Sequence, residues 1–228
     1  MSYLDIQLDR DEMHTKLGGA LPKNSLVLIE GNDGGGKSVL CQRLMYSMLK
    51  NDHTATYIST ELNTHEFVSQ MKSLNYHITK DLLDENLLFV PMFPFYGNVK
   101  LNKSFMDDLI SESKLYDNEI IIFDTFSYLL VKNHSDCDFF DIMSFFKQLL
   151  GLGKTLLVAI EPSQMPEDFL NMIHGMSDVF LKVEVRDYLG KLTNFIDIIR
   201  YKRAKKRLQK RIPFRVDPGI GMAIEISS

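Results

Sequence analysis

The sequence contains few cysteines and no long apolar run. Of its 228 residues only two are cysteines, Cys41 and Cys137, and both fall in segments with a helical pattern. Two cysteines make no disulfide framework, so we expect reduced, buried thiols in a cytoplasmic protein. No uncharged apolar stretch approaches the roughly 18 residues of a membrane-spanning helix. The start of the chain, Met1 to Asp5, shows no basic region followed by an apolar one, which predicts no signal peptide.

No low-complexity tract, internal repeat or Pro/Gly/Ser-rich linker divides the chain. A length of 228 residues suits one large domain. The 45% of hydrophobic and 25% of charged residues are ordinary for a globular protein. We therefore predict a single domain over residues 1–228, in the cytoplasm and peripheral to a membrane only through partners.

The charge is unevenly distributed along the chain. The net charge is −4, yet the segment from Arg200 to Arg211 contains eight basic residues and no acidic one. The rest of the chain has 18 basic residues against 30 acidic ones. An acidic body with one basic strip argues against a protein that coats nucleic acid and for one localised anionic target. The alternative for each lysine of the strip is a solvated hairpin.

Short apolar runs alternate with helical patterns in the first three quarters of the chain. Ile120–Phe123 and Leu156–Ile160 are apolar at every position, as in parallel strands that are covered on both faces. Repeated strand–helix units with right-handed crossovers form an α/β sandwich. The predicted strands are Ser25–Glu30, Thr54–Ser59, Leu87–Val90, Glu119–Asp124 and Thr155–Ile160, and the predicted helices are Lys37–Lys50, Thr64–Leu74, Asn102–Tyr116 and Asp138–Leu150.

After about Ser177 the pattern changes to strands with almost no helix between them. This change predicts an antiparallel extension of the same sheet and not a second domain. The strands predicted here are Val179–Val185, Asn194–Tyr201, Ile212–Val216 and Met222–Ile226.

A glycine-rich loop with the spacing of a phosphate-binding (Walker A) loop joins a predicted strand to a predicted helix. Its glycines allow the backbone to curl, so that successive N–H groups point at phosphate oxygens. The N-terminus of the helix adds partial positive charge. Lys37 is expected to reach the β- and γ-phosphates of ATP, and the Ser38 hydroxyl to bind Mg²⁺. The predicted nucleotide-binding residues here are Gly31, Asn32, Asp33, Gly34, Gly35, Gly36, Lys37, Ser38 and Val39.

Asp124 ends the very apolar strand that begins at Glu119. A carboxylate in this place lies at the carboxyl edge of the sheet, where ligands bind in open α/β folds. We predict that Asp124 is the Walker B aspartate, which binds the nucleotide and holds its Mg²⁺ through water. The alternative is that it caps the following segment together with Thr125 or Ser127.

Two glutamates follow other strands and are expected at the same edge. In phosphoryl transfer to water, a carboxylate near the γ-phosphate orients or deprotonates the attacking water, and Glu61 is the candidate for this role. The alternative is a helix start, because Thr64 and Glu66 follow. Glu161 is either a polar sensor at its strand end or an acidic residue before the turn at Pro162.

Several segments resemble the RecA/KaiC-like ATPases. Leu17–Ser25 resembles the glycine-rich turn that leads into the phosphate-loop strand of that family, and Ile212–Ile226 is similar to its final hairpin. Tyr57–Phe67 and Arg200–Ala204 most closely resemble the KaiC-like ATP-binding proteins of the archaeal flagellum (archaellum) motor. The resemblance covers nearly the whole chain, from about Leu17 onward.

The resemblance implies a RecA-like fold in which Lys37, Ser38 and Asp124 hold ATP and Mg²⁺, with Glu61 in the catalytic position. The clock protein KaiC has two adjacent glutamates at that position. This chain has one, followed by Leu62, which predicts slow or absent hydrolysis.

The resemblance also implies a homo-oligomeric ring. Arg200 and Lys202, two residues apart and therefore on one face of a strand, would complete the catalytic site of a neighbouring subunit. The implied partners are the secretion-type motor ATPase and the membrane protein that anchors the motor, with no nucleic acid and no direct insertion into the membrane. The predicted role is that of a nucleotide-gated assembly component of the motor.

Two other classes share features with this sequence. Glu30–Ser38 also resembles the loop of thymidylate kinases, but thirty residues precede the loop here and the Asp9-Arg10 pair precedes it instead of following it. A DNA recombinase would use the basic strip to follow a phosphate backbone. No basic residues interleaved with aromatics mark DNA-binding loops.

Overall fold

The computed structural model describes residues 2–9, 11–92, 109–128, 139–188 and 190–225. Its strands are β1 (Tyr3–Asp5), β2 (Ala20–Pro22), β3 (Leu26–Gly31), β4 (Ala55–Ser59), β5 (Leu87–Pro91), β6 (Ile120–Asp124), β7 (Thr155–Ile160), β8 (Val179–Tyr188), β9 (Lys191–Tyr201), β10 (Arg211–Asp217) and β11 (Gly221–Ile224). Its helices are α1 (Met13–Lys16), α2 (Lys37–Lys50), α3 (Thr64–Ser73), α4 (Thr79–Leu83), α7 (Phe139–Gly151) and α8 (Glu167–Met176), with the short 3₁₀ helices η1 (Ser113–Tyr116) and η2 (Pro162–Gln164).

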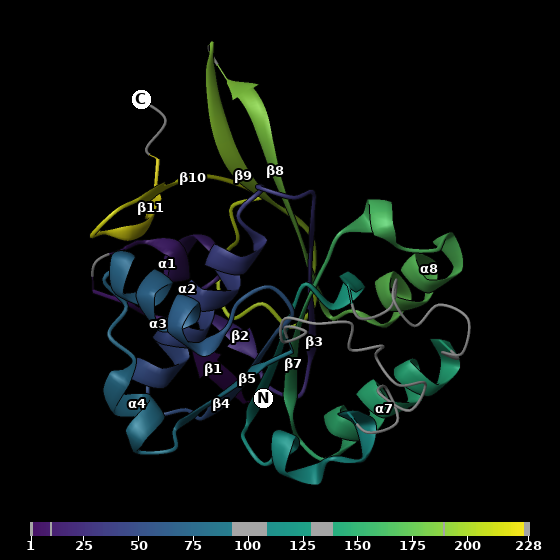
Figure 1. The fold of residues 1–228 in the computed structure, drawn as a ribbon. Coiled ribbons are helices and arrows are strands. Elements are labelled where there is room, and N and C mark those ends of the chain that lie inside the picture. Colours follow the sequence, from purple (N-terminus) through teal and green to yellow (C-terminus); the bar gives the residue numbers. More distant parts are fainter. Residues whose placement is uncertain (1, 10, 93–108, 129–138, 189, 226–228) are drawn as a thin grey trace, which may run out of the picture.

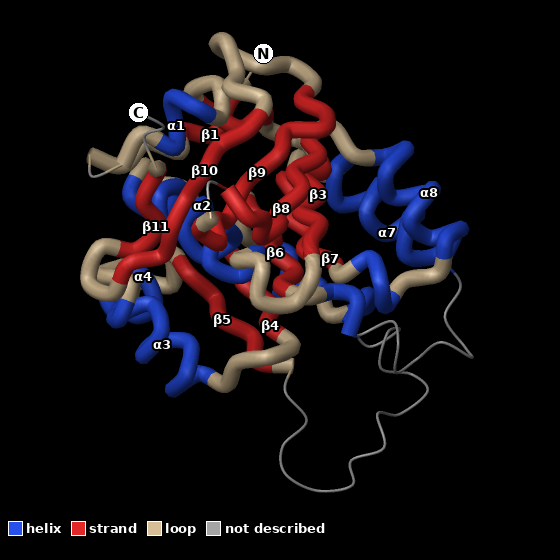
Figure 2. The backbone as a smooth tube through the Cα atoms, turned by 90° about the horizontal axis from the view of Figure 1, so that it is seen from above, coloured by secondary structure: helices blue, strands red, loops and turns tan. Residues whose placement is uncertain are grey.

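One nine-stranded sheet runs through the molecule in the order β11-β10-β9-β8-β3-β7-β6-β4-β5. The strands from β8 to β5 in this order are parallel to one another. Helices α1 to α4 cover one face of the sheet, and α7 and α8 cover the other (Figure 1). Seen from above, the strands lie between these two helical layers (Figure 2). The predicted α/β sandwich with a mainly parallel sheet is confirmed.

Alternate residues of the central strands supply two apolar layers. On β3, Val27 and Ile29 pack into the layer that contains α2 and α3, whereas Leu26 and Leu28 pack into the layer that contains α7 and α8. Strands β6 and β7 divide their residues between the two layers in the same way. Every position of these three strands is therefore buried, which explains why their sequences do not alternate between apolar and polar residues.

The first of the four late strands departs from the predicted antiparallel extension. β8 is parallel to β3 and antiparallel to β9, so the antiparallel part begins only at β9. A parallel neighbour requires a crossover connection, and α8 provides it between β7 and β8. Helix α8 is missing from the predicted elements. Pro166 before it and the acidic residues Glu167 and Asp168 in its first turn are nevertheless signals of a helix start.

Some predicted features lie partly outside the described residues, and the structure also contains elements that the sequence did not predict. β1 and β2 form a small antiparallel sheet that the sequence pattern does not predict. Of the predicted helix Asn102–Tyr116, residues 102–108 lie outside the described part, and the remainder ends in η1. Cys41 is a buried free thiol on α2, as predicted, whereas Cys137 is not among the described residues. No helix in the described ranges is long and apolar enough to cross a membrane.

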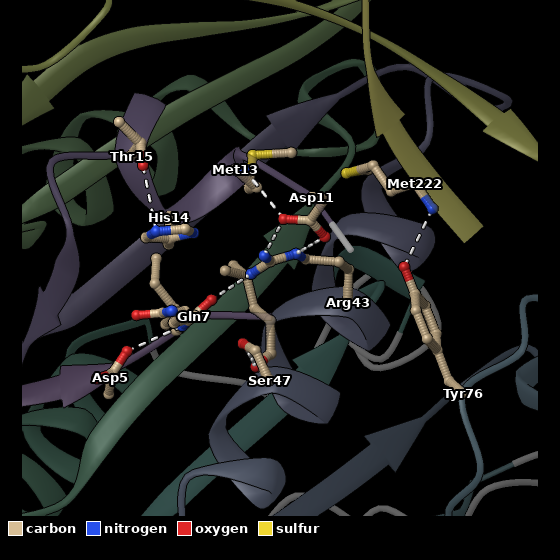
Figure 3. Close-up of polar contacts among 12 residues, drawn as sticks. Asp5, Gln7, Asp11, Met13, His14, Thr15, Arg43, Ser47, Tyr76 and Met222 are labelled. Carbon is tan, nitrogen blue, oxygen red and sulfur yellow. Dashed lines mark hydrogen bonds and ion pairs between the residues drawn. The ribbon is translucent and has the colours of Figure 1, made fainter. Parts of the chain in front are cut away.

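A buried ion pair fixes the N-terminal segment to α2 (Figure 3). The Arg43 side chain is fully buried on this helix. Its Nε donates to Asp11 Oδ2 at 3.0 Å, its Nη2 donates to Asp11 Oδ1, and its Nη1 donates to the carbonyl oxygen of Ile6 at 2.8 Å. The helix that follows the phosphate loop is thus held by the first residues of the chain.

Candidate phosphate-binding site

The glycine-rich loop connects β3 to α2 at the carboxyl edge of the sheet. At Gly31 an added Cβ would lie 2.3 Å from the carbonyl oxygen of Val183 on β8, so that only glycine fits there. Gly36 has φ of 97°, a left-handed conformation that glycine adopts without strain. It immediately precedes Lys37, the first residue of α2. The two positions explain why the loop needs glycine at its beginning and at its end.

The loop is closed by contacts among its own residues. The Lys37 ammonium donates to the carbonyl oxygen of Asn32 at 2.9 Å, and the Gly35 N–H donates to the same oxygen at 3.2 Å. The Gly34 N–H donates to Asp33 Oδ1 at 2.8 Å. The lysine therefore folds back over the loop, where its charge lies close to the N–H groups expected to face phosphate.

Strands β9 and β10 reach the loop from the C-terminal part of the chain. An added Cβ at Gly36 would lie 3.0 Å from a ring carbon of Phe214 on β10 and 3.5 Å from Asn194 Nδ2 on β9. Neither residue was among the predicted site residues, because strand periodicity does not show which loop a strand approaches. The antiparallel extension is therefore part of the wall around the phosphate loop.

Asp124 lies beside the loop, and both of its carboxylate oxygens accept hydrogen bonds there. The Ser38 hydroxyl donates to Asp124 Oδ1 at 2.9 Å, and the Tyr57 hydroxyl donates to Asp124 Oδ2 at 2.7 Å. The aspartate is 1% exposed. Its carboxylate thus faces α2 and β4 and does not cap the segment that follows β6. A hydroxyl and a carboxylate side by side are oxygen ligands of the kind that Mg²⁺ prefers, so this pair fits a nucleotide-bound magnesium ion.

The pKa of Asp124 is raised from 3.8 to about 6, chiefly because burial removes water from the carboxylate. The hydrogen bonds from Tyr57 and Ser38 oppose this rise in pKa, the negative charge of Glu61 adds to it, and Lys37 opposes it. The carboxylate is therefore costly to ionise in the folded chain until a cation joins it.

Asp124→Asn is expected to increase the free energy of unfolding at pH 7.5 by about 1–3 kcal/mol. The folded chain holds a proton on Asp124 between pH 4 and 6 that the unfolded chain has released, so the wild type loses this stabilisation as the pH rises through about 6. The difference in the free energy of unfolding between the variant and the wild type should therefore become smaller toward pH 4. Urea denaturation at both pH values measures it.

The control for this prediction is Asp197→Asn. Hydrogen bonds from Arg211 hold the pKa of Asp197 below its usual range, so this variant should be less stable than the wild type at pH 7.5. An equal gain for Asp124→Asn at the two pH values would contradict the raised pKa of Asp124.

Glu61 follows β4 at the same edge of the sheet and is exposed. The start of α3 does not depend on it, because Asn63 accepts from the Glu66 N–H and Glu66 accepts from the Asn63 N–H, both at 3.0 Å. The Glu61 N–H points back to Ser59 Oγ at 3.4 Å. Ser59, two residues before Glu61, lies opposite Asp124 in the pairing of β4 with β6, so Glu61 follows β4 next to the end of β6. The catalytic role of Glu61 stays a prediction.

Glu161 behaves as the acidic residue of a turn. Its two carboxylate oxygens accept from the Ser163 hydroxyl at 2.9 Å and from Gln164 Nε2 at 2.8 Å, both in η2. Its N–H donates to Ser127 Oγ at 3.1 Å. These bonds occupy its carboxylate within the turn that begins at Pro162.

Arg200 and Lys202 both have partners within their own chain. The Arg200 guanidinium donates to the carbonyl oxygens of His174 and Ser177 at the end of α8, with 3.2 Å to Ser177. The Lys202 ammonium lies 3.4 Å from Asp178 Oδ1. Both side chains are therefore engaged, and their role toward a neighbouring subunit stays a prediction.

Arg200 lies on β9, but Lys202 follows the strand in a turn, so the prediction that the two share one face of a strand is wrong. Both residues are nevertheless separated from the loop of the same chain. Arg200 lies opposite Phe180 on β8, which lies opposite Leu28 in the middle of β3. The Lys202 N–H bonds to the carbonyl oxygen of Asp178, at the beginning of β8. The phosphate loop follows the other end of β3, so this pair lies toward the opposite edge of the sheet.

Comparisons with known proteins agree with this geometry. The family model described as "ATPase: KaiC" matches residues 8–227. This chain belongs to the KaiC-like ATPases. Over its full length it is 39% identical to the archaeal flagellar ATP-binding protein FlaH of Methanocaldococcus jannaschii, of which it covers 98%. It is 38% identical to the protein of the same name from Methanococcus voltae, of which it covers 99%.

Solved structures give the same result for the fold of this KaiC-like chain. The crystal structure of the flagellar accessory protein FlaH from Methanocaldococcus jannaschii is similar to it with a TM-score of 0.93 and 38% identity, over 99% of this chain and 100% of that one. A KaiC-like protein from Pyrococcus horikoshii shares the fold, with a TM-score of 0.74 at 12% identity. The resemblance predicted from the sequence is confirmed, and the family match sets aside the thymidylate kinases.

Two residues of this KaiC-like site were not among the predicted site residues, although both lie in the segment Tyr57–Phe67 that carries the resemblance. Tyr57 lies within an apolar strand, where a tyrosine normally indicates only core packing. Thr60 donates its hydroxyl hydrogen bond to the carbonyl oxygens of Asp124 and Thr125, at 3.2 Å each. Both residues come from β4 or its end, and only the pairing of β4 with β6 brings them to Asp124.

Proposed function

We propose that this KaiC-like protein binds ATP with Mg²⁺ and acts as a nucleotide-gated assembly component of an archaeal flagellar motor. The observation that carries the proposal is the 2.9 Å contact between the Ser38 hydroxyl and Asp124, directly behind a glycine loop and its buried Lys37. The name of the relatives, archaeal flagellar ATP-binding protein FlaH, supports the place of the protein in that motor.

The residues of the loop have separate tasks in this proposal. The N–H groups of Gly34 and Gly35 and the Lys37 ammonium exchange their acceptors within the loop for the phosphates when ATP binds. The Gly36 N–H adds to these donors, with Val39 in the first turn of the helix. Ser38 and Asp124 hold Mg²⁺, which supplies charge neutralisation for the phosphate groups when it is bound.

Hydrolysis in this proposal is slow or absent. Glu61 is the carboxylate that follows the end of β4, and the neighbouring Leu62 side chain packs against the hydrophobic core. The side chain that follows Glu61 therefore contributes no second charge to the site. A single exposed glutamate suits a protein whose contacts with other subunits depend on whether nucleotide is bound. It suits an enzyme that hydrolyses ATP rapidly less well.

The proposed assembly is a homo-oligomeric ring. Arg200 and Lys202 lie away from the loop of their own chain, and a head-to-tail contact would bring this edge of one subunit to the loop of the next. The proposed partners are the motor ATPase and the membrane-anchored scaffold, with the protein in the cytoplasm and peripheral to the membrane through them. The single large sheet supports the proposal that residues 1–228 form one domain.

Removing Arg200 and Lys202 together is expected to abolish the increase in mass that ATP and Mg²⁺ produce in the wild type. Without these cations, the phosphates of a neighbouring subunit lose their contacts across the interface, while binding within one subunit continues through Lys37. Light scattering of the wild type and of Arg200→Ala/Lys202→Ala, each with and without ATP, measures the change.

The matched control is Lys80→Ala/Lys114→Ala, which removes two exposed cations outside the basic strip. It should assemble as the wild type does. Arg200 also holds the end of α8, so thermal unfolding of each variant must be recorded in parallel. If the wild type has the mass of a monomer both with and without ATP, the ring is excluded, and ATP binding has to be judged separately.

A further inference from the structure

Thr125, the residue directly after Asp124, has an unusual backbone conformation. Its φ is 59°, in the left-handed region. The other non-glycine residues with positive φ in the described ranges are unbranched at Cβ, namely Asn24, Asp52, Asn75, Glu85 and Arg203. A β-branched residue is a true outlier in this region, and such a conformation persists only where the surrounding structure enforces it.

Contacts from two directions enforce the conformation of Thr125. The Thr60 hydroxyl bridges the carbonyl oxygens of Asp124 and Thr125, at 3.2 Å each. The Tyr128 N–H donates to the carbonyl oxygen of Thr125 at 3.1 Å. The turn after β6 is therefore tied to the end of β4, one residue before Glu61.

The Thr125 hydroxyl takes no part in the hydrogen bonds that hold this turn. The residue is 4% exposed, and its hydroxyl has no hydrogen-bond partner among the residues that the structure describes. The hydroxyls around it are all bonded: Ser38 to Asp124, Thr60 to the turn, and Ser127 to the Glu161 N–H. Buried hydroxyls are almost always paired, so the unpaired hydroxyl of Thr125, the residue next to Asp124, calls for a partner that a bound ligand would supply.

We propose that the Thr125 hydroxyl binds the terminal phosphate of ATP and thereby distinguishes ATP from ADP. The inference rests on the proposed ATP site, because Thr125 adjoins Asp124, whose carboxylate contacts Ser38. A hydroxyl donates to a phosphate oxygen in a short, charge-assisted bond. ADP has no terminal phosphate to accept this bond. Thr125 thus determines specificity by direct contact with the nucleotide, and Thr60 links its turn to the end of β4.

The test compares Thr125→Ser with Thr125→Ala, two variants that differ only in the hydroxyl. Calorimetry of the full chain with Mg²⁺ gives the dissociation constants for a non-hydrolysable ATP analogue and for ADP. Thr125→Ser should keep the wild-type ratio of the two constants. Thr125→Ala should bind the ATP analogue about tenfold more weakly, with ADP affinity unchanged.

Thr125→Val gives a second variant without the hydroxyl that keeps the β-branch, and it should match Thr125→Ala. Equal ratios in the wild type and in either hydroxyl-free variant would overturn the inference, as would an equal loss of affinity for both nucleotides. Failure of the proposed function looks different: in that case the wild type itself would bind neither nucleotide.

Discussion

Arg43→Ala is expected to lower the free energy of unfolding by about 3–5 kcal/mol. The substitution leaves the Asp11 carboxylate almost fully buried without its cation, and it removes the donor to the carbonyl oxygen of Ile6. Because a domain of this kind is stable by only about 5–15 kcal/mol, much of its stability would be lost. Urea denaturation followed by circular dichroism measures the change.

A control and a partial rescue accompany this prediction. Arg215→Ala removes an exposed arginine that pairs with Asp217 at 2.6 Å, and it should change the stability by less than about 1 kcal/mol. Arg43→Met combined with Asp11→Leu replaces the buried pair by apolar side chains and should recover part of the loss. A loss for Arg43→Ala no larger than that of the control would show that the ion pair does not hold the N-terminal segment.

Lys37→Ala is expected to abolish the stabilisation of the protein by ATP and Mg²⁺. The Lys37 ammonium contacts the Asn32 carbonyl oxygen within the loop, so its removal should cost little of the stability of the free protein. In the wild type, ATP at a hundred times its dissociation constant should add about 2.7 kcal/mol to the free energy of unfolding. Thermal unfolding with and without the nucleotide compares the two proteins.

Lys50→Ala is the matched control for this experiment. Lys50 ends the same helix, where its ammonium lies 3.3 Å from Asp81 Oδ2, and it is far along α2 from the loop. This variant should keep the full ATP-dependent shift in unfolding temperature. A shift in Lys37→Ala as large as in the wild type would exclude the loop from ATP binding.

The sequence by itself determined the features that depend on neighbouring residues. The loop from Gly31 to Ser38 contains its glycines, lysine and serine in one stretch, with a strand before it and a helix after it, so local backbone preferences are enough to predict it. The apolar runs at Ile120–Phe123 and Leu156–Ile160 likewise predict strands covered on both faces. The place of Asp124 near the loop also followed, because the carboxyl ends of parallel strands share one edge of the sheet.

Only the tertiary structure decided which distant groups meet. Tyr57 and Ser38 reach Asp124 because β4 lies beside β6 and because α2 packs on the same face of the sheet. Arg200 is bound within its own chain because α8 ends next to β9, and α8 also makes β8 parallel. The backbone of Thr125 is left-handed because Thr60 holds two carbonyl oxygens at once. Periodicity reports which face of an element is apolar, but such pairings depend on the positions of elements far apart in the sequence, which no local pattern contains.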